Sequence, residues 1–177
     1  MSNSPLSDDF PESSPPPEWL ARRAAGLLLH ITSLPGDYGI GNLGHPARAL
    51  LDFLADAGLS YWQICPVGPT GYGDSPYQVF SSYAGNPYFI DWSPIRDANL
   101  LAQDELVPLG ELPTDHIDYG KLYERFWPIA RTASRRFAES PASLEHLYGS
   151  YQNFLEENAH WLKPYALYQT LKIDQQQ

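Results

Sequence analysis

The stretch that decides the fold is Gly68-Pro-Thr-Gly-Tyr-Gly-Asp-Ser-Pro-Tyr-Gln78. Its glycines and prolines, with one Asp and one Ser, are typical of a loop. It directly follows the apolar run Tyr61–Val67, which predicts a buried strand. Because α/β folds place ligand sites in loops at the carboxyl ends of such strands, the sequence predicts an α/β fold with a ligand-binding loop here.

A strand and a helix precede this loop. Residues Ala25–Ile31 form a continuous apolar run, which predicts a first strand covered on both faces. Residues His45–Ala57 predict a helix that begins near Pro46 and ends before Gly58. Its apolar positions recur at helical spacing, at Ala47, Leu50, Leu51 and Leu54. Strand, helix and strand together predict one right-handed βαβ unit.

Two features near the first strand have alternative interpretations. His30 interrupts the apolar run, either as a hydrogen-bonded core histidine or as a side chain that faces the site. Residues Gly39–Gly44 match the G-x-G-x-x-G pattern of dinucleotide-binding folds. Because the strand ends well before these glycines and no acidic residue lies between Asp56 and Asp74, we reject nucleotide binding.

The rest of the chain predicts a third short strand and then mainly helices. We expect a strand over Tyr88–Trp92, and an irregular surface excursion over 96–118 with a short helix near Ala98–Asp104. Helices are predicted over 119–137, with a kink at Pro128, over 142–160, and from Pro164 onward. The predicted organisation is a disordered Pro/Ser/Asp-rich tail over 1–18, a barrel-like part over 19–95 and a helical part over 96–177.

Composition limits the classes of function. The net charge of -10 argues against nucleic acid and anionic membranes as partners, and no apolar stretch approaches the length of a membrane span. The single cysteine, Cys65, lies in a strand-like run and is predicted to be a buried structural thiol. A chain without a disulfide framework fits a reducing cytoplasm. The histidines are scattered singly, so we expect no metal site.

The loop offers the chemistry of sugar recognition. Tyr72 and Tyr77 supply rings on which a sugar can stack, and Asp74, Ser75 and Gln78 supply hydrogen-bonding groups. For Tyr77 the alternative is a ring that packs at the mouth of the fold. For Asp74 it is a structural role in the turn. Asp91 is interpreted as a structural hydrogen-bond acceptor, so the sequence provides no pair of facing carboxylates.

Four segments carry a resemblance to a known family: His30–Gly44, Tyr61–Gln63, Gly71–Gln78 and Ala84–Tyr88. In this order and spacing they resemble the start of the 4-α-glucanotransferases (amylomaltase or disproportionating enzyme, glycoside hydrolase family 77). The resemblance implies the N-terminal part of a (β/α)8 TIM barrel with a helical insertion. It also implies an enzyme that moves α-1,4-glucan segments between maltooligosaccharides by a retaining mechanism, without cofactor or metal.

By the resemblance, Tyr77 matches the aromatic residue that stacks on the sugar at the cleaved bond, and Tyr72 matches a glucan-contacting tyrosine. Asp74, Ser75 and Gln78 match the polar members of the same loop. The family's catalytic carboxylates lie farther along than this sequence extends, so no catalytic residue is assigned. We expect the chain alone to be inactive, with the C-terminal part of the barrel as a partner. The alternatives are a non-catalytic glucan-binding fragment and a protein-interaction remnant.

Overall fold

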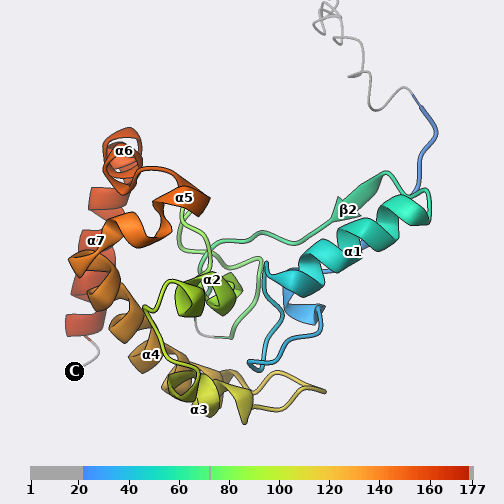
Figure 1. The fold of residues 1–177 in the computed structure, drawn as a ribbon. Helices are drawn as coiled ribbons and strands as arrows, with labels where there is room; N and C mark the ends of the chain where they lie inside the picture. The colour runs from blue at the N-terminus through green and yellow to red at the C-terminus, as the bar shows by residue number, and fades with distance from the viewer. Residues whose placement is uncertain (1–21, 72, 176–177) are drawn as a thin grey trace, which may run out of the picture.

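A computed structural model describes residues 22–71 and 73–175, and Figure 1 shows their arrangement. The βαβ unit lies to one side of Figure 1, and the later helices gather on the other. In chain order the elements are β1 (Gly26–Leu28), a 3-10 turn (Ile31–Ser33), α1 (His45–Asp56), β2 (Tyr61–Gln63), a 3-10 turn (Pro87–Phe89), α2 (Trp92–Asp97), a 3-10 turn (Asp104–Leu106), α3 (Val107–Gly110), α4 (Tyr119–Glu139), a 3-10 turn (Pro141–Leu144), α5 (Glu145–Tyr148), α6 (Tyr151–Glu157) and α7 (Ala159–Asp174). The expected tail over 1–18 lies outside the described residues.

The predicted strand–helix–strand unit is confirmed, with shorter strands than expected. β1 and β2 pair in parallel, with Leu27 opposite Trp62 at the centre. The indole Nε1 of Trp62 also donates to the carbonyl of Leu29 at 2.7 Å, just past β1. A side chain at Gly26 would meet the carbonyl oxygen of Tyr61 at 2.7 Å, so glycine permits the close approach of the two strands.

Helix α1 packs on this sheet through part of its predicted apolar face. Ala47 and Leu54 are buried, whereas Leu51 is 50% exposed. Gly58 follows the helix with φ 69°, a left-handed conformation that glycine adopts without strain. The strands are not covered on both faces as expected, because Leu28 on β1 is 64% exposed.

The glycine pattern over 39–44 serves packing. Gly41 donates its N–H to the carbonyl of Thr32 at 3.3 Å. A Cβ at Gly41 would collide with the carbonyl of Ile31, so only glycine fits this approach. The segment after β1 therefore folds back as a tight turn, in place of a phosphate-binding strand-to-helix junction.

The expected strand over Tyr88–Trp92 is wrong. The segment forms a 3-10 turn and the start of α2, because two side chains cap the backbone. Asn86 accepts from the N–H of Tyr88 and Asp91 accepts from the N–H of Ser93, each at 3.0 Å. Asp91 is thus the N-cap of α2, which confirms its predicted role as a structural acceptor.

The expected surface excursion over 96–118 is also wrong, since its leucines form the main core. Leu101, Leu106 and Leu109 are almost completely buried against Leu122 and Phe126 of α4. The short helix expected near Ala98–Asp104 is absent from the described structure, where a 3-10 turn and α3 follow instead. Ile40 and Trp92 join the same core, so the earlier and later parts of the chain pack together.

The C-terminal helices differ from expectation in their boundaries. Helix α4 holds Pro128 inside it, as predicted. The expected helix over 142–160 is divided, because Gly149 has φ 80° and ends α5. Helix α7 begins at Ala159, so Pro164 lies inside it and does not start it. In the described part of the chain we find no helix long and apolar enough to cross a membrane.

Candidate functional site

A pocket of about 190 Å³ lies beside the loop that follows β2. Its polar lining comes from segments far apart in the sequence. The polar lining residues are His30, Thr32, Thr70, Asp74, Asn86 and Tyr119. The 3-10 turn after β1, the loop over 68–78 and the start of α4 therefore meet at one place.

Backbone contacts hold the base of the loop. Thr70 and Val79 form an antiparallel bridge, and the N–H of Phe80 donates to the carbonyl of Pro69 at 3.0 Å. The ring of Phe80 lies directly against Gly71, where an added Cβ would collide with the ring. These contacts hold the two ends of the loop together.

Helix α7 supports the segment that follows the loop. Lys172 places its ammonium 3.8 Å from the centre of the Phe80 ring, a cation–π contact. Tyr83 stacks on Trp161, with ring centres 5.9 Å apart and planes inclined by 11°. These contacts tie the loop to the helical part of the chain.

Asp74 is the carboxylate of the pocket. Its N–H donates to the carbonyl of Gly71 at 3.0 Å, and its φ of 51° follows a φ of 91° at Gly73. The backbone therefore makes the turn, while the side chain lines the pocket. Partial burial raises the pKa of Asp74. Within the described residues no hydrogen bond to its side chain is found, which leaves its acceptor capacity available.

The other titratable groups of the pocket favour their neutral forms. Burial lowers the pKa of His30, whose Nδ1 is buried without a hydrogen-bond partner in the described structure. The imidazole packs edge-on against Phe89 at 5.6 Å. Burial, and then the charge of Asp74, raise the pKa of Tyr119. His30 thus faces the pocket, in agreement with the second of its two interpretations. The pocket thus offers hydrogen-bonding groups of His30 and Tyr119 beside the Asp74 carboxylate.

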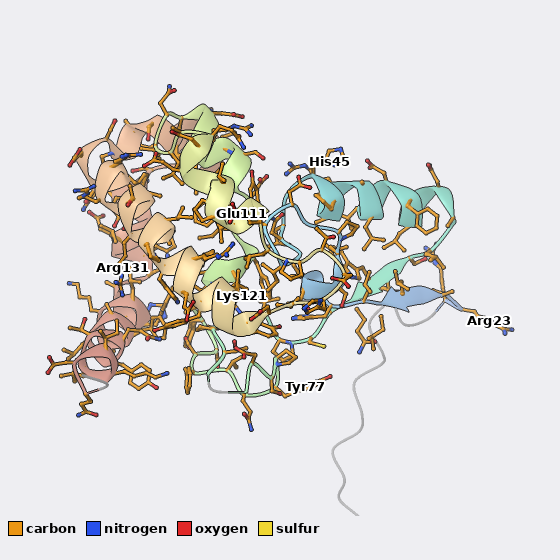
Figure 2. All side chains as sticks on the ribbon, turned by 90° about the horizontal axis from the view of Figure 1, so that it is seen from below. Arg23, His45, Tyr77, Glu111, Lys121 and Arg131 are labelled. Atoms are coloured by element: carbon orange, nitrogen blue, oxygen red, sulfur yellow. The ribbon has the colours of Figure 1, made fainter. Side chains whose placement is uncertain are left out.

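Tyr77 and Gln78 lie on the exposed side of the same loop. Tyr77 is 76% exposed, and Figure 2 shows it at the edge of the molecule. Gln78 is exposed as well, and its N–H donates to the carbonyl of Ser75 at 3.0 Å. The hydroxyl of Ser75 accepts a long 3.4 Å hydrogen bond from the N–H of Tyr77. Tyr72 lies outside the described residues.

Cys65 adjoins Tyr77, and the prediction of a buried thiol is wrong. Its side chain is partly exposed, because the chain after β2 runs along the surface. The Cys65 sulfur lies 3.6 Å from the Tyr77 hydroxyl.

The structure thus places Asp74 in the pocket and Tyr77 and Gln78 outside it, on one loop. Sequence reasoning missed Thr32, Asn86 and Tyr119 as pocket residues. Tyr119 lies 45 positions from Asp74, at the start of a helix whose apolar spacing identified it only as a packing residue. Its position in the pocket follows from tertiary packing.

The described lining of the pocket does not hold a pair of carboxylates. Asp74 is the one carboxylate in its described lining. Asp91 caps helix α2 and forms an ion pair with Arg48, in which Arg48 Nη2 lies 3.4 Å from Asp91 Oδ2. Over residues 22–71 and 73–175, no group of three or more His, Cys, Asp or Glu could hold a metal ion.

A second pocket, of about 210 Å³, lies between α4, α5 and α6. It is lined mainly by apolar and aromatic side chains, among them Phe137, Tyr151 and Phe154, with Glu145 as its carboxylate. It lacks the convergence of polar groups from distant segments that the first pocket has, so we place the candidate site at the first pocket and its loop.

Comparison with known proteins gives consistent results. The family model described as 4-alpha-glucanotransferase matches residues 29–177. A 4-alpha-glucanotransferase of Thermus thermophilus is 48% identical over 150 residues, which are 85% of this chain and 29% of that protein. One from Clostridium butyricum is 42% identical over 146 residues, 81% of this chain and 28% of that protein.

Among solved structures, an amylomaltase from Streptococcus agalactiae in complex with acarbose matches with a TM-score of 0.69 and 37% identity. The match covers 78% of this chain and 27% of that one. The chain therefore spans well under a third of the length of the relatives it matches.

Proposed function

Because the chain belongs to the 4-alpha-glucanotransferase family, we propose that it supplies a glucan-binding loop of an enzyme that transfers α-1,4-glucan segments between maltooligosaccharides. The family match over residues 29–177 carries the proposal, since it includes the whole loop and the pocket beside it. It also confirms the family resemblance drawn from the four sequence segments. The complex of the related amylomaltase with acarbose supports an oligosaccharide ligand.

We assign the loop residues to the glucan by their chemistry. The exposed ring of Tyr77 provides a flat apolar surface for a sugar ring. We assign Tyr72 to a second sugar contact by the family resemblance. Gln78 and Ser75 provide donors and acceptors for sugar hydroxyls beside Tyr77. The half-buried carboxylate of Asp74 accepts hydrogen bonds from hydroxyls inside the pocket.

In this proposal the βαβ unit is the beginning of a (β/α)8 barrel and residues 96–177 are a mainly helical insertion. The parallel pairing of β1 and β2 and the likeness to the amylomaltase support it. The C-terminal part of the barrel is the proposed protein partner, and the proposed location is the cytoplasm. No role for nucleic acid or membrane is proposed, given the net charge of -10.

Transfer itself requires more than this chain offers. A retaining mechanism needs two carboxylates about 5–5.5 Å apart on either side of the scissile bond. Asp74 has no second carboxylate beside it in the described pocket lining. We therefore propose that the chain alone binds glucan without transferring it, and that the catalytic pair comes from the rest of the family fold.

Incubation with maltotriose tests the assignment. The purified chain should produce neither glucose nor longer maltooligosaccharides, whereas addition of the downstream part of a related enzyme should restore both. If the chain alone formed these products in larger amounts than an Asp74→Asn variant does, the assignment of catalysis to other residues would be contradicted. A titration that shows no maltotriose binding would instead favour the protein-interaction alternative.

A further inference from the structure

The side chain of Tyr77 depends on few contacts for its orientation. Its phenyl ring makes no aromatic contact with the other described residues, and 76% of the residue is exposed. Its backbone N–H donates to the Ser75 hydroxyl in a long 3.4 Å hydrogen bond, within the turn that the Gln78 N–H closes on the Ser75 carbonyl. The turn fixes the Cα of Tyr77 but leaves rotation about the side-chain bonds free.

Cys65 supplies the missing contact at the far end of the ring. It lies two residues after Gln63, the last residue of β2. Its sulfur lies 3.6 Å from the phenolic oxygen, within the range of a hydrogen bond to sulfur. The ring of Tyr77 is therefore attached to the loop at its Cα and contacts Cys65 at its hydroxyl.

We propose that Cys65 is a positioning residue, whose thiol holds the Tyr77 ring in the orientation in which it receives a glucan. This inference rests on the proposed function, because it deepens the role assigned to Tyr77. A ring that is oriented before binding loses less conformational freedom when the sugar arrives, and binding is correspondingly tighter.

The electrostatics of the pair agree with this contact. The hydrogen bond with the Cys65 side chain, and then electrostatic repulsion from it, raise the pKa of the Tyr77 phenol. This shift provides a readout of the contact that does not require a glucan. A Cys65 that packed against the loop without touching the hydroxyl could not form the hydrogen bond, which is the first cause of this shift.

Cys65 is also the single cysteine of the sequence, so a thiol reagent has one target. With methyl methanethiosulfonate, the Cys65 thiolate attacks the reagent's methylthio sulfur. A disulfide to the S-methyl group forms, the bond to the sulfonyl sulfur breaks, and methanesulfinate leaves with the electron pair. The product has no S–H and carries an extra methylthio group between the strand end and the Tyr77 ring.

The test compares the wild-type chain with Cys65→Ala and Cys65→Ser. The phenol pKa is followed by NMR of tyrosine labelled with carbon-13 at Cζ, with Tyr77→Phe to assign the resonance. Maltotriose affinity is measured by tryptophan fluorescence at submicromolar protein concentration. We expect Cys65→Ala to lower the Tyr77 pKa and to weaken binding by about twofold to tenfold, the loss of one hydrogen bond. Cys65→Ser should recover part of both effects.

Methylthiolation of the wild-type chain should weaken maltotriose binding, and the same treatment of Cys65→Ala should have no effect. An unchanged Tyr77 pKa in Cys65→Ala, or an unchanged affinity despite a shifted pKa, would overturn the inference. If the wild-type chain fails to bind maltotriose while its Tyr77 pKa still responds to Cys65, the proposed function fails and the contact stands. A urea unfolding curve for each variant establishes that it is folded.

Discussion

Replacement of Tyr77 by Ala separates a binding role from a packing role. Tyr77 is 76% exposed, so its removal takes away little buried surface. For an exposed position without a special backbone conformation, we expect the free energy of unfolding to change by less than about 0.5 kcal/mol. A residue that acted as a packing prop at the mouth of the fold would cost more, because the ring would be buried there.

The effect on glucan binding should be larger than the effect on stability. If the ring stacks on a sugar, its loss removes an interaction comparable to that of an aromatic pair, about 0.5–1.5 kcal/mol. This corresponds to about a twofold to tenfold weaker affinity for maltotriose. Tyr77→Phe keeps the ring but loses the contact with Cys65, so its affinity should lie between the wild type and Tyr77→Ala.

The assay is a fluorescence titration with maltotriose, beside a urea unfolding curve for each variant. Tyr148→Ala is the matched control, since Tyr148 is 67% exposed and lies at the end of α5, outside the loop. It should bind maltotriose as the wild type does. Wild-type affinity in Tyr77→Ala, or a fall in unfolding free energy of several kcal/mol with unchanged binding, would refute the stacking role.

Three further results are expected. The chain should self-associate as its concentration rises, because β1 and β2 have open edges and Leu28 and Phe53 are 64% and 61% exposed. Analytical sedimentation should show a mass that grows with concentration, and a constant monomer mass at micromolar concentration would contradict this. His30→Gln should reduce the loss of stability on acidification. Burial lowers the pKa of His30 in the folded state below 6.5, so as the pH falls through 6.5 the unfolded chain takes up a proton that the folded chain resists. An identical pH dependence of the urea midpoint in the wild type and in His30→Gln would disprove this expectation. Phe126→Ala should lower the free energy of unfolding by about 3–5 kcal/mol, since Phe126 is 1% exposed and packs against Tyr88 and Trp92. A decrease below about 1 kcal/mol in urea unfolding would contradict the close packing of this core.

The sequence predicted those elements that local patterns determine. Helix α1 follows from Pro46, a recurring apolar spacing and Gly58, and the structure places its ends within a residue or so of the prediction. The two parallel strands follow from apolar runs that flank this helix. Their short length could not be read from those runs, because strand length depends on which neighbours are present to pair.

The errors arose where side chains compete with propensity or where packing is long-range. Tyr88–Trp92 has the composition of a strand, but capping by Asn86 and Asp91 gives helical turns. The leucines over 100–112 lie among Pro108, Gly110 and Pro113, which predict an irregular segment, so only their contacts with α4 identify them as core. The turn at Asp74 was predictable from its Gly and Asp residues, whereas the approach of Tyr119 to the same pocket was not.

Discrimination between two trisaccharides tests the central claim most directly. Maltotriose and cellotriose contain the same glucose units and differ in the α- or β-configuration of their linkages. We predict that the chain binds maltotriose saturably and binds cellotriose at least several-fold more weakly, with the difference reduced in Tyr77→Ala. Equal binding of the two sugars, or no binding of maltotriose by a folded chain, would contradict the assignment of this loop to α-1,4-glucan.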